Sequence, residues 1–406
     1  MTRAGAGLTT AILLLGVPGA SAAQSAWSWP TYQANQEHSG YLPISLQIDQ
    51  FEQLWSLPAW PSRLNPVVAA EGMVFVTPWI YFTAGDQLLA IDARRGEILW
   101  SKNFGSVFSV NSPAVAYGNV YLQTGSSIPT GSPPLFRAFA AATGDFVLQR
   151  EYPAQWERHY SPTIVDGIAY ANGGTYGGLI AFDAHAPIVH WETPLNQYDE
   201  WTPAVDDLYA YAYTGLYEPR LSIIERSSGA EVRSIADPGF VWNGWSMQLA
   251  PVLGGADDVI VIQAQRLISF DLLSDTIRYQ IDGALFEGQP SVGGGRIFAL
   301  ASGALTVWDE RTGAFLWSWA PTQEPLTGTV LVTKTHVLTR SATHTFAIDQ
   351  FTHAEVWSIP VSGQLAWSEG LLFLAGEDGF LTAVRAPAQI FADGFESGTT
   401  SHWLVQ

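Results

Sequence analysis

Short runs of alternating apolar and polar residues recur along the chain, and Gly, Pro, Asn or Asp bound each run. The stretches 72–76, 118–121 and 167–170 are examples, each a turn glycine followed by mostly apolar residues. A period of two indicates half-buried β-strands, whereas a helix would place its apolar residues three and four positions apart. No helical period is evident, so the pattern predicts an all-β protein of short strands and tight turns.

One phrase repeats: an apolar and an acidic residue, then Gly four positions on and Trp eight positions on. It is complete in residues 92–100 and 309–317. The acidic position recurs at Asp92, Asp183, Glu225, Asp271, Asp309 and Asp349, with Ala140 as a degenerate copy. Successive copies lie 48, 43, 42, 46, 38 and 40 residues apart, the repeat length of a propeller blade. We expect the carboxylate to cap its turn and the Trp to pack between blades.

A second phrase, a small residue and Pro before a strand, marks the inner strand of each unit. It occurs at Pro66, Pro113, Pro162, Pro203, Pro251 and Pro290, and weaker copies follow at 328–330 and 365–367. Eight inner strands predict an eight-bladed β-propeller of four-stranded antiparallel blades, with seven blades as the main alternative. The last unit lacks an outer strand, which residues 53–56 can supply. The ring is then closed by an N-terminal strand, so no sheet edge stays open at the join.

Together the two phrases resemble the pyrroloquinoline-quinone-like (PQQ-like) β-propeller repeat family, over roughly residues 51–386. The stretch from Trp29 to Gly40 also resembles the segment that precedes the first blade in secreted members. The resemblance implies the fold and leaves the function open. The family includes dehydrogenases, an outer-membrane assembly scaffold lipoprotein and exported proteins of unknown role.

The N-terminus has the features of a targeting segment. Arg3 precedes an apolar run at 8–17, and small residues at 20–22 offer a cleavage site. We expect four parts: a signal peptide at 1–23, a lead-in segment at 24–50, the PQQ-like propeller at 51–386 and a tail at 387–406. The mature protein is then an exported monomer, periplasmic or secreted, without a transmembrane segment.

The amino-acid composition limits the classes of partner and the kinds of cofactor that we expect. The chain has 18 Lys and Arg against 37 Asp and Glu, a net charge of -19, which disfavours nucleic acid and favours neutral or cationic ligands. It has no Cys, so it can hold neither an attached haem nor a disulfide. For a dehydrogenase, the resemblance implies a vicinal Cys pair, a Ca²⁺ held by carboxylate and amide, and an Asp base. No residues here match these, so we expect no cofactor and no metal, with pyrroloquinoline quinone kept as an alternative.

The residues just before the inner strands accumulate polar and aromatic chemistry. In a propeller these loops gather round the axis on one face, so residues distant in sequence converge. Four consecutive loops supply the candidate ligand-binding residues: His159, Tyr160, Glu200, Trp201, Asn243, Trp245, Glu287 and Gln289. Aromatic faces and a few oriented polar groups suit a sugar or a peptide. The alternative is a hydrated rim in which Trp245 packs into the core.

We therefore predict an exported, non-enzymatic propeller that binds a protein, peptide or carbohydrate partner at its axial rim. One alternative is an enzyme, either a quinoprotein-like oxidoreductase or a lyase or hydrolase that uses Glu200 and Glu287. Another is a structural module of envelope assembly. The sequence assigns no catalytic residue.

Overall fold

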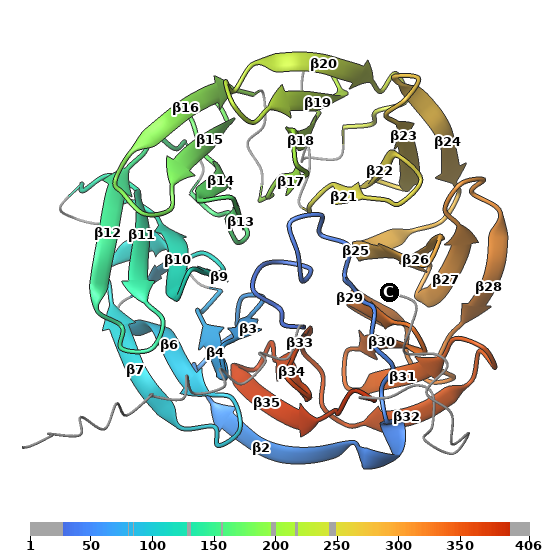
Figure 1. Cartoon of the computed structure of the whole chain (residues 1–406). Coiled ribbons are helices and arrows are strands. Elements are labelled where there is room, and N and C mark those ends of the chain that lie inside the picture. The colour runs from blue at the N-terminus through green and yellow to red at the C-terminus, as the bar shows by residue number, and fades with distance from the viewer. Residues whose placement is uncertain are drawn as a thin grey trace, which may run out of the picture.

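The described residues form eight blades around a central axis (Figure 1). The computed structural model describes residues 27–79, 81–83, 85–127, 131–155, 157–195, 200–215, 218–242 and 249–389. The predicted signal peptide and all but the first three residues of the predicted tail lie outside these ranges. The eight-bladed, four-stranded antiparallel propeller is confirmed, and the alternative of seven blades is wrong.

The blades follow one another in chain order. Blade 1 contains β3 (Val68–Ala70), β4 (Met73–Val76), β6 (Asp86–Asp92) and β7 (Ile98–Asn103). Blade 2 contains β9 (Ala114–Ala116), β10 (Asn119–Thr124), β11 (Leu135–Ala140) and β12 (Phe146–Glu151). Blade 3 contains β13 (Thr163–Val165), β14 (Ile168–Asn172), β15 (Gly178–Asp183) and β16 (Val189–Pro194). Blade 4 contains β17 (Ala204–Val205), β18 (Tyr209–Thr214), β19 (Arg220–Glu225) and β20 (Glu231–Ala236).

The second half of the ring repeats this arrangement. Blade 5 contains β21 (Val252–Leu253), β22 (Asp258–Gln263), β23 (Arg266–Asp271) and β24 (Thr276–Asp282). Blade 6 contains β25 (Phe286–Gly293), β26 (Arg296–Ala301), β27 (Ala304–Asp309) and β28 (Phe315–Trp319). Blade 7 contains β29 (Leu326–Thr333), β30 (His336–Ser341), β31 (Thr345–Asp349) and β32 (Glu355–Ile359), with β1 (Tyr41–Leu42) added parallel to β29.

Blade 8 joins the two ends of the chain. Its strands β33 (Gln364–Ser368), β34 (Leu371–Ala375) and β35 (Phe380–Arg385) are completed by β2 (Glu52–Pro58), which the 3-10 turn η1 (Ile48–Gln50) precedes. Trp55 lies opposite Ala383 in this pairing, so the predicted closure is confirmed. Outside the blades, β5 (Tyr81–Thr83) pairs with β8 (Val107–Ser109). No helix in the described ranges is long and apolar enough to cross a membrane.

The repeat phrase is a contact between neighbouring blades. Trp55 of blade 8 donates its indole N–H to the carbonyl of Ala93 in the blade 1 hairpin, at 3.1 Å. A Cβ added to Gly96 would lie 2.7 Å from the Trp55 ring, so only glycine lets the ring pack there. The same contact recurs as Trp100 on Gly144, Trp191 on Gly229 and Tyr279 on Gly313. Each outer aromatic ring therefore fixes its blade to the next one.

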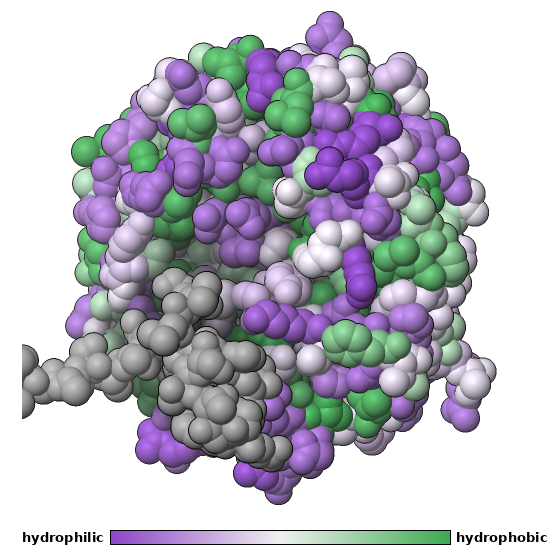
Figure 2. Space-filling view, turned by 45° about the vertical axis from the view of Figure 1, so that its right-hand side comes forward, coloured by the Kyte–Doolittle hydropathy of each residue, from purple (hydrophilic) through white to green (hydrophobic). Residues whose placement is uncertain are grey.

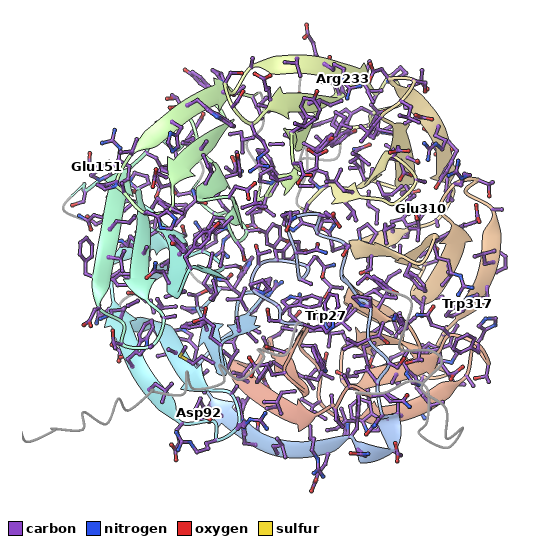
Figure 3. All side chains as sticks on the ribbon, in the orientation of Figure 1. Trp27, Asp92, Glu151, Arg233, Glu310 and Trp317 are labelled. Carbon is purple, nitrogen blue, oxygen red and sulfur yellow. The ribbon has the colours of Figure 1, made fainter. Side chains whose placement is uncertain are left out.

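The acidic residue of the phrase holds the hairpin that receives this ring. The Asp92 carboxylate accepts the backbone N–H groups of Arg94 and Arg95, at 3.0 and 2.8 Å. These bonds hold the pKa of Asp92 below its usual value, although desolvation opposes them. Asp92 and Trp317 lie at the circumference, far from the axis where Trp27 lies (Figure 3). The predicted structural role of the acidic positions agrees with this placement.

The described lead-in residues, 27–50, cross the middle of the ring and contact the inner strands in chain order (Figure 1). An inner strand pairs with its own blade along one edge only and would leave the N–H groups of its other edge unpaired. Carbonyls of Trp29, Pro30, Gln36, Glu37, Ser39 and Gly40 accept N–H groups of Ala69, Val115, Val205, Leu253, Val292 and Val332. These six acceptors serve blades 1, 2, 4, 5, 6 and 7.

His38 fastens the same segment to blades 3 and 4. The ring is fully buried; Nδ1 lies 2.7 Å from the Tyr32 carbonyl, and Nε2 lies 2.8 Å from the Pro203 carbonyl and 3.0 Å from the Thr163 hydroxyl. Burial lowers the pKa of His38 to about 4, while the two carbonyls act in the opposite direction. The ring is therefore neutral at pH 7.

We predict unequal costs for two residues of one repeat phrase. Trp317 is 7% exposed, lies in the core between blades 6 and 7, and stacks on His353. Trp317→Ala should therefore lower the free energy of unfolding by about 3–5 kcal/mol. Asp309 accepts the Thr312 N–H at 2.9 Å, so Asp309→Ala should cost only about 1 kcal/mol. Denaturant unfolding measures both, and equal losses would contradict these roles.

A second prediction concerns acid. The unfolded chain takes up a proton on His38 below its ordinary pKa near 6.5, whereas the folded chain does so only near 4, so stability falls across this window. When the pH falls from 6.5 to 5.0, protonation of His38 in the unfolded chain should lower the free energy of unfolding by about 1.5 kcal/mol. His38→Gln should remove that part of the fall, and His185→Gln, at an exposed hairpin, should leave it unchanged. Parallel pH profiles for wild type and His38→Gln would contradict the prediction.

Candidate functional site

A cavity of about 520 Å³ lies on the axis, on the face that carries the loops before the inner strands. Its wall combines aromatic, guanidinium and carboxylate groups: Trp79, Tyr160, Arg63, Arg340, Glu200, Glu287 and Glu377. Tyr32 of the lead-in segment also lines it, and its ring stacks on Tyr160 with centroids 4.4 Å apart. The lead-in segment therefore forms part of the cavity floor.

A larger groove adjoins the axial cavity over blades 6, 7 and 8. Its volume is about 1160 Å³, and it shares Glu287, Thr327, Arg340 and Glu377 with the axial cavity. On the face drawn in Figure 2, hydrophilic side chains predominate toward the middle and hydrophobic ones recur along the circumference. Exposed outer-strand residues such as Phe146 and Phe315 belong to this circumference.

Three of the eight candidate residues line the axial cavity: Tyr160, Glu200 and Glu287. His159 lies beside them but is buried. Trp201 is 0% exposed and packs in the core between blades 3 and 4, out of reach of a ligand in the cavity. Asn243 and Trp245 lie outside the described residues.

Gln289 is the last of the candidates, and it holds two blades together. Its side-chain amide donates to the Ala250 carbonyl at 2.8 Å and accepts the Ala250 N–H at 2.9 Å. The side chain is 1% exposed. Both functions of the amide are therefore used between blades 5 and 6, as in a backbone pair.

Buried polar atoms without hydrogen-bond partners gather beside the cavity. Among the described residues, no hydrogen-bond partner is found for either ring nitrogen of His159, for Nη2 of Arg158 or for Nε of Arg63 and Arg340. Burial lowers the pKa of His159 to about 3, and the nearby Arg158 charge acts in the same direction. His159 is therefore a neutral side chain at pH 7, next to a cationic one.

Two arginines lie against one aromatic ring. The Cζ atoms of Arg63 and Arg158 lie 4.5 and 4.0 Å from the Trp79 ring centroid. Arg158 Nε also lies 3.3 Å from Glu200 Oε1, and Arg340 Nη2 lies 3.3 Å from Glu377 Oε1. The cavity wall thus combines two arginines with three glutamates, a mixture that the net charge of -19, from which we expected neutral or cationic ligands, does not reveal.

The prediction of the rim missed Trp79, Arg340 and Glu377. Trp79 follows the second strand of blade 1, Arg340 lies near the end of the second strand of blade 7, and Glu377 follows the second strand of blade 8. The loops between second and third strands reach the same face as the loops before inner strands. Including both kinds of loop in the search would have found these residues from the repeat alone.

The fold family implies pyrroloquinoline quinone, a planar tricarboxylate that is held with a metal. The arginines could meet its carboxylates. However, two guanidinium groups already contact the Trp79 ring, and Tyr32 already stacks on Tyr160. Among the described residues, no three His, Cys, Asp or Glu side chains are grouped to hold a metal. These residues do not form a fitting site for the cofactor with its metal, and we derive no chemistry through it.

Comparisons with known proteins support the assignment of the repeat, and the matching proteins have several different functions. Residues 45–198 match the family model described as outer membrane protein assembly factor BamB. No curated protein sequence matches the chain. BamB from Moraxella catarrhalis superposes with a TM-score of 0.59 at 13% identity, covering 82% of this chain and 99% of that one. A quinohemoprotein alcohol dehydrogenase from Comamonas testosteroni gives 0.68 at 14% identity, covering 90% and 82%.

A computationally designed protein, Ika8, has the same fold, with a TM-score of 0.60 at 14% identity and coverage of 82% of this chain and 99% of that one. At these identities the structural matches show the fold alone, which an assembly factor, a dehydrogenase and a designed protein share. The ring of eight blades and the match over residues 45–198 confirm the resemblance drawn from the repeat phrases. The chain is therefore an eight-bladed β-propeller, and its residues 45–198 are similar to PQQ-like repeat proteins.

Proposed function

We propose that this chain is an exported binding propeller that holds a segment of a protein, peptide or glycan partner in its axial cavity. The observation that carries this proposal is the convergence of side chains from loops and strand ends of blades 1, 3, 4, 5, 6, 7 and 8 on one cavity. Concave sites with aromatic walls and a few oriented polar groups are typical ligand sites. The adjoining groove gives an extended ligand a path outward from the axis.

The comparisons favour a protein partner among these three. The matching family model and one of the similar structures are named for an assembly factor of the outer membrane. An assembly factor works through contacts with other proteins. A bacterial envelope location, reached through a signal peptide at residues 1–23, would place this chain among such partners. We extend both features to this chain as part of the proposal.

A bulky residue at the cavity wall tests the proposal. Thr327 is half-buried and lines both the cavity and the groove, so Thr327→Trp should fill the shared space. Peptide and glycan arrays should show ligands that bind wild type and bind this variant at least about tenfold more weakly, a loss of about 1.4 kcal/mol. Thr276→Trp, at an exposed outer hairpin, is the matched control and should bind as wild type does.

Circular dichroism of both variants should match the wild type, which separates loss of the site from loss of the fold. If array ligands bind Thr327→Trp as tightly as wild type, the binding site does not lie in the axial cavity. Turnover of a bound ligand that Glu200→Gln abolishes, with binding retained, would support the enzyme alternative in place of a binding protein.

A further inference from the structure

Three arginines at or beside the axial cavity differ in their carboxylate partners: Arg63 and Arg340 line the cavity, and Arg158 lies against the Trp79 ring of its wall. Arg158 and Arg340 each have one carboxylate oxygen at 3.3 Å, from Glu200 and Glu377. Arg63 forms no ion pair with any described residue, and its guanidinium lies against the Trp79 ring. Arg63 also lies close enough to Arg340 for the two charges to repel each other. Among the described residues, Arg63 is therefore the cavity-lining arginine without a carboxylate partner.

Burial makes incomplete pairing of these guanidinium groups costly in free energy. The side chains of Arg158 and Arg340 are only 6% and 4% exposed, so water cannot solvate their free N–H groups fully. Within the described part of the chain, Nη2 of Arg158 and Nε of Arg63 and Arg340 have no hydrogen-bond partner. Native proteins rarely leave buried donors unpaired, and unpaired donors on charged groups are the most costly. Glu287 does not relieve them in the same way, because it is exposed at the rim and solvated by water.

We infer that Arg63 and Arg340, which both line the cavity, form a carboxylate-binding subsite for a peptide segment of the partner. This inference rests on the proposed function and names the chemistry that the cavity selects. A carboxylate seated between Arg63 and Arg340 meets two guanidinium groups that line the cavity and gives Arg63 a carboxylate partner. Planar guanidinium groups bind carboxylates through paired, charge-assisted hydrogen bonds, which are stronger than neutral ones.

The adjoining groove favours a peptide over an acidic sugar as the carrier of this carboxylate. Leu285, Val361 and Phe380 line the groove together with Pro325 and Pro360. Leu285 and Phe380 are exposed at 55% and 42%. Apolar side chains of a peptide can cover these residues, whereas the hydroxyl groups of a sugar cannot. The carboxylate itself can be a C-terminus or an Asp or Glu side chain.

A peptide array printed in matched forms tests the inference. Each sequence is present with a free C-terminus, with an amidated C-terminus, and with each Asp or Glu replaced by Asn or Gln. We expect bound peptides to lose at least tenfold in affinity when one carboxylate becomes an amide. The amidated form identifies a C-terminal carboxylate as the ligand, and the Asn and Gln forms identify a side chain. Raising the salt concentration should weaken the carboxylate forms more than the amide forms.

Variants of Arg63 connect this preference to the subsite. Arg63→Gln should bind carboxylate and amide forms equally, because the preference depends on its charge. Arg63→Lys keeps the charge and should restore part of the preference, which also controls for folding. Arg311→Gln removes one positive charge from an exposed outer hairpin and should leave the preference as in wild type.

The outcomes separate this inference from the proposed function. Peptides that bind wild type but not Thr327→Trp, with no difference between carboxylate and amide forms, would overturn the inference and keep the axial site. A preference for carboxylates that survives in Arg63→Gln would overturn it as well. Binding of acidic glycans without any peptide would overturn the assignment to a peptide. Ligands unaffected by Thr327→Trp would reject the axial site itself.

Discussion

The inner strand of each blade has an edge that faces the axis, and the fold depends on how the N–H groups of those edges are paired. Each blade is a separate four-stranded sheet, so at the centre of the ring no further strand of the blade pairs with the inner strand. The lead-in segment resolves this constraint by passing the inner strands in order and offering a carbonyl to six of them. Each carbonyl meets one particular inner strand, so the segment connects six blades at the axis.

The requirement for close approach is visible in single residues of the lead-in segment. Gly40 has a φ of 59°, and a Cβ there would lie 2.1 Å from the Ser291 hydroxyl oxygen, so no other residue fits without movement. His38 is fully buried between backbone carbonyls of the lead-in segment and of blade 4. The same segment places Tyr32 in the cavity wall, so the residues that pair with the inner strands also form part of the floor of the site.

Contacts at the circumference and at the axis have separate tasks. The outer aromatic rings pack on the glycines of the next hairpin and hold neighbouring blades at a fixed spacing. Axial positions that line the cavity, such as Glu200, are then free to vary, whereas Trp201 and Gln289 at the same face pack between blades. This separation explains how one fold serves an assembly factor, a dehydrogenase and a designed protein. The function of this chain must therefore be argued from its own cavity.

The sequence predicted the fold well because the repeat phrase is itself the contact between blades. The Asp92–Gly96–Trp100 phrase recurs in seven copies and the inner strands in eight, so eight blades could be counted and Trp55 could be assigned to the last one. The site was predicted less well. Loop position alone cannot separate Glu200, which lines the cavity, from the adjacent Trp201, which packs in the core. Nor can net charge reveal three arginines at the axis, because local charge depends on which loops converge.

Hydrogen exchange measured by mass spectrometry, with and without a saturating array-derived peptide, tests the central claim of an axial site most directly. If the site is axial, we expect slower exchange of backbone amides in the loops that carry Arg63, Trp79 and Glu377, and unchanged exchange in the outer hairpins at 92–97 and 309–314. Protection confined to those outer hairpins, with the axial loops unaffected, would contradict it.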